Sequence, residues 1–142
     1  MSSHSTTNAA GAQALRAGGE GWSIVDVRTA EEFNRGHPAG AHHVPLAVPG
    51  PFGLMFNPGF VAAMKQRFAP SDRLILTCAV GSRSRQACEI LAAEGFSNLV
   101  NLHGGFDGAR DMFGRLVEPG WAASGLAVET GASTPVERAD PG

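Results

Sequence analysis

Short apolar segments alternate with helix-compatible segments along most of this chain. The segments at 23–27, 74–78 and 98–102 have the length and apolar composition of buried strands, and stretches with helical character lie between them. Strands that alternate with helices form parallel sheets, because each connection has to cross back over one face of the sheet. The sequence therefore predicts an α/β fold with a mainly parallel central sheet flanked by helices on both faces.

Capping residues and glycines mark where the helices are expected to begin and end. Asn8 can cap a helix over 9–17, and the capping box Thr29-Ala30-Glu31-Glu32 starts a second helix that ends near Gly36. The Gly- and Pro-rich start of the segment 47–59 predicts a mobile surface loop. Further helices are expected from Pro58, with Asn57 as its cap, to about Phe68, over 85–94, around 106–113 and around Trp121.

The length of 142 residues suits one domain. We expect a flexible N-terminus at 1–8, a folded domain over 9–129 and a flexible tail at 130–142. Neither a secretory signal nor an apolar run of membrane-spanning length is visible. The net charge of -2 argues against nucleic-acid or membrane-surface partners. Two cysteines are too few for a disulfide scaffold, so we expect a reducing, cytoplasmic setting.

The segment from Cys78 to Ser84 carries the most chemical information. A predicted strand delivers Cys78 to a short loop with Gly81 at its middle, and a helix follows. Helix N-termini have unpaired N–H groups and a partial positive charge, so a loop curled there forms an anion cradle. A cysteine sulfur in such a cradle is stabilised as the thiolate. We therefore expect Cys78 to be a reactive nucleophile that faces an anionic substrate.

Several neighbours of Cys78 have more than one interpretation. Gly81 is expected to take a positive φ that lets the loop curl. Ser82 can donate a hydrogen bond to bound sulfur or simply begin the helix. Arg83 can clamp an anion, or it can brace the loop by pairing with Asp26 or a nearby glutamate. Cys88 has the position of a core residue on the helix, with a resolving thiol as the alternative.

The histidines invite a metal hypothesis that the pattern does not favour. His42 and His43 are adjacent on a short predicted strand, so their side chains point to opposite faces. His37 has no carboxylate or cysteine partner at metal-ligand spacing. We therefore expect structural roles for all three, and neither a metal nor another cofactor.

Taken in order along the chain, these segments resemble the rhodanese domain in its single-domain sulfurtransferase form. The resemblance covers roughly residues 9–129. The matching segments are Ile24-Val25-Asp26-Val27-Arg28, Gly36–Pro45 (like G-H-I-P-G-A-x-x-I-P), Cys78–Ser84 (C-x-x-G-x-R-S), Gly104-Gly105-Phe106 (like G-G-W) and Trp121–Val128 (like W-x-x-x-G-L-P-V). Several motifs in the proper order are far more specific than any one of them.

The chain departs from the family pattern around the pocket rather than in the cysteine loop. Phe106 replaces a tryptophan and Ala127 replaces a proline. The stretch 111–120 lengthens the gap before Trp121, and the 47–57 segment is also long. These departures concern the rim where an acceptor would bind.

The resemblance implies a sulfur-transfer cycle on Cys78 that needs no cofactor. The Cys78 thiolate would take the outer sulfur of thiosulfate, release sulfite and hold a persulfide. Cyanide or a thiol, with a thioredoxin- or glutaredoxin-like protein as a candidate partner, would remove that sulfur. Asp26 and Arg28 would support the site. The expected substrate-binding residues are Ala79, Val80, Gly81, Ser82, Arg83 and Ser84.

Two other functions remain alternatives. Tyrosine-type phosphatases use C-x5-R, whereas the spacing from Cys78 to Arg83 is C-x4-R. The shorter loop has one N–H fewer, so it suits a single sulfur better than a phosphoryl group or arsenate. The second alternative is a non-enzymatic sulfur-carrier or binding module. Such modules usually lose the cysteine, which this chain keeps.

Overall fold

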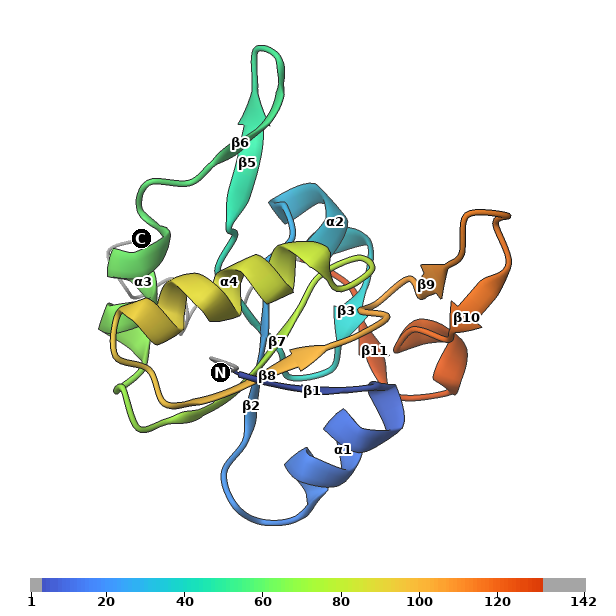
Figure 1. Ribbon diagram of the computed structural model, residues 1–142, viewed down its shortest axis with the longest axis horizontal. Helices are drawn as coiled ribbons and strands as arrows, with labels where there is room; N and C mark the ends of the chain where they lie inside the picture. Colours follow the sequence, from blue (N-terminus) through green and yellow to red (C-terminus); the bar gives the residue numbers. More distant parts are fainter. Residues whose placement is uncertain (1–3, 132–142) are drawn as a thin grey trace.

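The computed structural model describes residues 4–131. Its centre is a five-stranded sheet with the order β1-β8-β7-β2-β4, and every neighbouring pair is parallel (Figure 1). These strands are β1 Ser5–Thr7, β2 Ser23–Asp26, β4 His42–His43, β7 Arg73–Thr77 and β8 Asn98–Leu102. The predicted α/β architecture with a parallel sheet is therefore confirmed.

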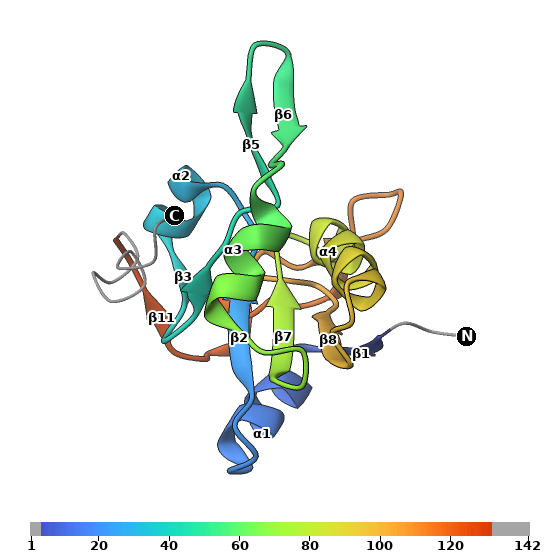
Figure 2. The same cartoon turned by 90° about the vertical axis from the view of Figure 1, so that its left-hand side faces the viewer.

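Helices cover both faces of this sheet (Figure 2). They are α1 Ala9–Ala17, α2 Ala30–Arg35, α3 Phe60–Arg67 and α4 Ser82–Ala93, with a short 3-10 helix at Ala122–Ser124. Side chains alternate along the strands, so β2, β7 and β8 each contribute residues to two cores, one on either face of the sheet. Val25 and Leu74 pack with α3 and α4, whereas Ile24 and Ile75 pack with α1 and α2. Among the described residues, no helix combines the length and the apolar composition that a membrane span needs.

The predicted helix starts at Asn8 and Thr29 are confirmed. The Asn8 Oδ1 atom accepts a hydrogen bond from the Gly11 amide at 2.9 Å. The Thr29 hydroxyl and the Glu32 carboxylate exchange bonds with each other's backbone, which completes the capping box. The third helix begins at Phe60 rather than Pro58, because the Asn57 side chain accepts from the Gly59 amide in a turn that precedes it.

The folded part begins before residue 9. Ser5–Thr7, expected to belong to a flexible terminus, form β1 and pair with Val100–Leu102 of β8. Without β1, the backbone donors and acceptors on that edge of β8 would face no strand. At the other end, Val128–Glu129 form β11, which pairs with β3 at His37–Pro38. Of the expected tail at 130–142, residues 132–142 lie outside the described part.

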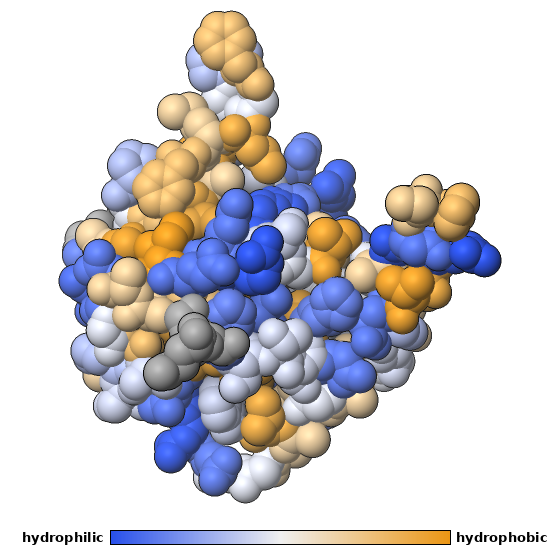
Figure 3. Space-filling view, viewed as in Figure 1, coloured by the Kyte–Doolittle hydropathy of each residue, from blue (hydrophilic) through white to orange (hydrophobic). Residues whose placement is uncertain are grey.

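Two segments that were not expected to contain strands are β-hairpins. The expected mobile loop at 47–59 contains β5 Ala47–Gly50 and β6 Gly53–Phe56. Gly50, Pro51 and Gly53 therefore make a tight turn rather than a long loop. The helix expected at 106–113 is absent, and β9 Ala109–Arg110 pairs with β10 Leu116–Glu118. Figure 3 shows apolar side chains gathered at the ends of both hairpins, with a polar surface between them; the exposed ones are Phe52, Leu54, Met55, Phe56, Met112, Phe113, Leu116 and Val117.

Candidate active site

Cys78 is the first residue after β7, at the carboxyl end of the sheet, where open α/β folds bind ligands. Its side chain is buried, and its Sγ atom lies inside the curl of the loop that leads into α4. The amides of Gly81 and Ser84 donate to Sγ at 3.1 and 3.3 Å. The Ser84 hydroxyl lies 3.4 Å from the same sulfur. The predicted cradle of N–H groups around the cysteine is thus present.

The segment 104–107 determines which way the loop peptides face. Its amides donate to the carbonyl oxygens of Cys78 and Ala79 at 2.8 Å each and of Val80 at 3.0 Å. Because these carbonyls are held on the outside of the loop, the loop cannot turn them toward the sulfur. The Gly-Gly-Phe motif therefore orients the cradle, a role that its sequence did not reveal.

Gly81 and Asn101 hold the shape of the loop that forms the cradle. Gly81 has a φ of +116°, which confirms the expected positive value and lets the chain turn into α4. Its carbonyl accepts from the Asn101 amide group at 3.2 Å and from the Arg85 backbone amide at 3.2 Å. The Asn101 Oδ1 atom also accepts from the Ser84 hydroxyl at 2.5 Å. Asn101 was not a predicted site residue; its only signal was a polar residue within an apolar strand.

Arg83 pairs with Glu32, not with Asp26. Its two terminal nitrogens donate to the two carboxylate oxygens at 2.9 and 3.0 Å. These hydrogen bonds from Arg83 lower the pKa of Glu32 to about 2, with further help from Thr29. Bonding to Glu32 likewise raises the pKa of Arg83. In this arrangement Arg83 ties the start of α4 to the capping box of α2.

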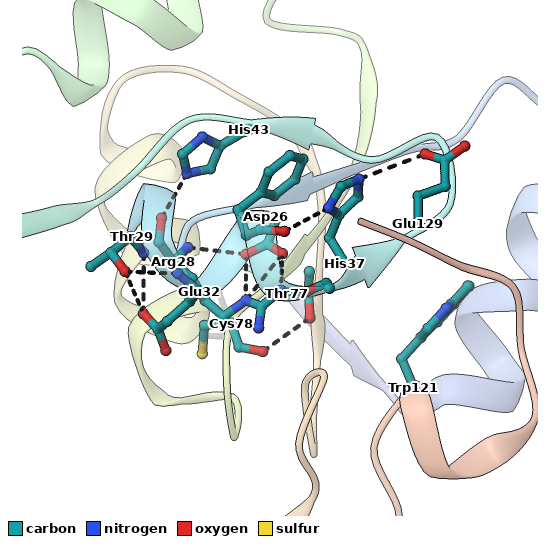
Figure 4. Close-up of polar contacts among 12 residues, drawn as sticks. Asp26, Arg28, Thr29, Glu32, His37, His43, Thr77, Cys78, Trp121 and Glu129 are labelled. Carbon is teal, nitrogen blue, oxygen red and sulfur yellow. Dashed lines mark hydrogen bonds and ion pairs between the residues drawn. The ribbon is translucent and has the colours of Figure 1, made fainter. Parts of the chain in front are cut away.

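Asp26 and Arg28 form a buried ion pair next to this site (Figure 4). The Arg28 guanidinium donates to both Asp26 oxygens and, at 2.6 Å, to the Gly36 carbonyl. It also lies 4.6 Å from the centre of the Phe106 ring. The pair therefore links the end of β2, the end of α2 and the segment 104–107, as expected of supporting residues that hold the scaffold.

The other predicted loop residues differ in their exposure to solvent. Ala79 is half-buried, whereas Val80 and Ser82 are exposed. Ser82 begins α4 and is not among the groups that contact Sγ. The amides of Ser82 and Arg83 have no acceptor among the residues that the structure describes, as is usual at a helix start. They remain available for a second, outer anionic atom.

Cys88 and the histidines lie outside the cradle. Cys88 is fully buried on α4, and desolvation raises the pKa of its thiol to about 12. The His37 ring stacks on Phe33 at 3.6 Å, and its Nδ1 lies 2.8 Å from the Phe33 carbonyl oxygen. His43 contacts the Arg28 carbonyl oxygen through Nε2 at 2.8 Å. Within residues 4–131, no group of three or more His, Cys, Asp and Glu side chains is placed to hold a metal ion.

Comparison with known proteins gives one consistent family. Residues 8–111 match the model of the rhodanese-like domain. Thiosulfate sulfurtransferase 16, a chloroplastic protein of Arabidopsis thaliana, is 38% identical over 106 residues, which are 75% of this chain and 78% of that protein. The mitochondrial protein HIGH ARSENIC CONTENT 1 of the same plant is 33% identical over 86 residues, 61% of this chain and 51% of that protein.

Solved structures show the same fold. The crystal structure of Rv0390 from M. tuberculosis superimposes with a TM-score of 0.76 at 27% identity, covering 92% of this chain and 100% of that one. Thiosulfate sulfurtransferase from Pseudomonas aeruginosa gives a TM-score of 0.60 at 21% identity and covers 92% of this chain and 21% of that one.

Proposed function

This chain belongs to the rhodanese-like domain family, and from that premise we propose that it is a thiosulfate sulfurtransferase that carries sulfane sulfur on Cys78. The observation that carries the proposal is the set of donors directed at Sγ, from the Gly81 and Ser84 amides. Such donors stabilise negative charge on sulfur without the need for a neighbouring base.

The first half-reaction forms the persulfide. The Cys78 thiolate attacks the outer sulfur of thiosulfate, and the sulfur–sulfur bond of thiosulfate breaks. Sulfite leaves with the electron pair of that bond, and the enzyme holds Cys78–S–S⁻. The amides of Ser82 and Arg83, which have no internal acceptor in the described part of the chain, are suited to bind the new terminal sulfur.

The second half-reaction returns the enzyme to the thiolate. A nucleophile, cyanide in an assay or a thiol in the cell, attacks the terminal sulfur and displaces the Cys78 thiolate. A reducing, cytoplasmic setting would keep Cys78, which is a free cysteine, available for each cycle.

Arsenate reduction is the second candidate, because the name of one relative, HIGH ARSENIC CONTENT 1, refers to arsenic. An arsenate or phosphate group presents several oxygens that each need a donor. The C-x4-R loop is short, and both terminal nitrogens of Arg83 already bind Glu32. We therefore rank sulfur transfer above oxyanion reduction or hydrolysis.

The two functions are separated by parallel assays on one preparation. Sulfur transfer is measured as thiocyanate formed from thiosulfate and cyanide. Arsenate reduction is measured as arsenate-dependent oxidation of glutathione. We expect thiocyanate formation that Cys78→Ser abolishes and Cys88→Ser retains. Arsenate-dependent turnover that exceeds thiocyanate formation would overturn the proposal.

A further inference from the structure

A cavity lies beside the catalytic loop, next to the β9–β10 hairpin, whose turn and second strand belong to the insertion at 111–120. This cavity has a volume of about 580 Å³. Val80, Gly81 and Ser82 line it on the loop side, and Ala109 and Arg110 of β9 line it on the other. Arg110 keeps its place because it pairs with Leu116 of β10, a strand that lies within the inserted stretch.

The cavity is larger than the small substrates of the proposed cycle require. Pockets of roughly 300–1,000 Å³ typically hold organic molecules of many atoms. Thiosulfate and cyanide have only a few atoms each and would leave most of this volume unfilled. The size indicates that a larger organic substrate uses the space next to the loop.

Charged side chains around the cavity indicate the chemistry of that substrate. The guanidinium groups of Arg85 and Arg110 are exposed, so a ligand can reach both. Arg85 pairs with Glu89 at 3.3 Å, in an exposed ion pair of a kind that contributes little to stability. Arg110 donates to the neutral Gly114 carbonyl at 2.8 Å, and no carboxylate in residues 4–131 pairs with it. Asp107 is the acidic residue of the lining.

We propose that this cavity binds the organic sulfur acceptor, a small thiol that carries a carboxylate, and that Arg110 binds the carboxylate. This inference rests on the proposed sulfurtransferase function. Guanidinium groups suit the task because they hold carboxylates through paired N–H donors. Arg110 thus determines specificity for the acceptor rather than taking part in bond breaking.

The acceptor step is balanced without any further reactant. The thiolate R–S⁻ attacks the terminal sulfur of Cys78–S–S⁻ and forms a new sulfur–sulfur bond. The bond between that sulfur and Cys78 Sγ breaks, and its electron pair returns to Sγ as the thiolate. The product R–S–S⁻ leaves. Both reactants are anions, so the positive charge of Arg85 and Arg110 also offsets their mutual repulsion.

The test compares two acceptors that differ only in charge, 3-mercaptopropionate and 3-mercaptopropionamide, with thiosulfate as the donor. For each protein, kcat/KM is measured with both acceptors, and their ratio is compared between the unmodified protein and Arg110→Gln. Each acceptor is its own reference across proteins, so their different intrinsic nucleophilicities cancel. The matched control is Arg115→Gln, because Arg115 lies on the same hairpin, pairs with Asp111 and is not part of the cavity lining.

We expect Arg110→Gln to lower the ratio of carboxylate to amide acceptor about tenfold, which corresponds to about 1.4 kcal/mol, while Arg115→Gln keeps it. An unchanged ratio in Arg110→Gln would overturn the inference, and so would an equal loss with both acceptors, which would mark a structural role. If the unmodified protein forms no thiocyanate from thiosulfate and cyanide, the proposed function itself fails. If thiocyanate forms but the ratio of carboxylate to amide acceptor is the same in Arg110→Gln and the unmodified protein, only the proposed acceptor site is refuted.

Discussion

Replacing Gly105 with alanine should disable the catalytic loop through a single added methyl group. Gly105 has a φ of +53°, and a Cβ there would lie 2.7 Å from the Ala79 carbonyl carbon and closer still to the Cys78 carbonyl oxygen. Non-bonded carbon atoms prefer about 3.5–4.0 Å, so the two peptide groups that follow Cys78 and Ala79 would have to move by about 1 Å. These two peptide groups carry carbonyls that orient the cradle.

The magnitude follows from two costs. The left-handed backbone conformation costs a non-glycine residue about 1–2 kcal/mol, and overpacking typically adds about 1–3 kcal/mol. Gly105→Ala should therefore lower the free energy of unfolding by roughly 2–5 kcal/mol, measured by urea denaturation. A displacement of about 1 Å at a catalytic group can reduce turnover about 100-fold, measured as thiocyanate formation.

The matched control for Gly105→Ala is Gly19→Ala. Gly19 has a φ of +84°, but nothing lies within 4 Å of a Cβ added there. This variant should lose only the backbone cost of about 1–2 kcal/mol and keep full turnover. If Gly105→Ala matched Gly19→Ala in both stability and turnover, the claim that the segment 104–107 orients the cradle would be refuted.

Three further predictions concern single side chains. Cys88→Ala should keep turnover within about tenfold of the unmodified protein, or 1.4 kcal/mol of barrier; a folded but inactive variant would indicate a second catalytic thiol. Native Cys88 should also resist alkylation by iodoacetamide at pH 8, since burial raises the pKa of its thiol to about 12. Glu32→Gln should destabilise the protein at pH 7 by about 1–2 kcal/mol. Because the folded-state pKa of Glu32 is lowered from 4.5 to about 2, its contribution is present above pH 4.5 and lost as the pH falls toward 2, so denaturation midpoints of variant and unmodified protein should converge there; a constant difference across that range would contradict the Arg83 pairing. Asn101→Leu should leave the Gly81 carbonyl one partner short and cost about 1–3 kcal/mol of stability by urea denaturation, with lower turnover; unchanged values for both would show that Asn101 does not hold the loop.

Much of the fold could be predicted because its signals are local. Strand segments such as 98–102 are apolar and short, and the caps at Asn8 and Thr29 act within one helical turn. The β5–β6 hairpin was missed because glycine and proline mark both loops and tight turns, and the cross-strand pairs that decide between them are not local. Similarly, Ser5–Thr7 form a strand only because β8 offers an open edge.

In the candidate site, too, features set by the local sequence could be predicted and features set by contacts across the fold could not. Cys78, Gly81 and the start of α4 follow from a contiguous segment, so the sequence could place the cradle. The partner of Arg83 could not be chosen, because Asp26 and Glu32 are both distant in sequence and only the packing of α2 decides between them. The roles of Asn101 and of the segment 104–107 depend on hydrogen bonds across the fold, which no local pattern encodes.

The most direct test of a persulfide on Cys78 is mass spectrometry of the protein after treatment with thiosulfate. The account predicts an increase equal to the mass of one sulfur atom, located on the peptide that contains Cys78. Cyanide or dithiothreitol should remove it, and Cys78→Ser should never acquire it. An unmodified Cys78, or a sulfur adduct located on Cys88, would contradict the account.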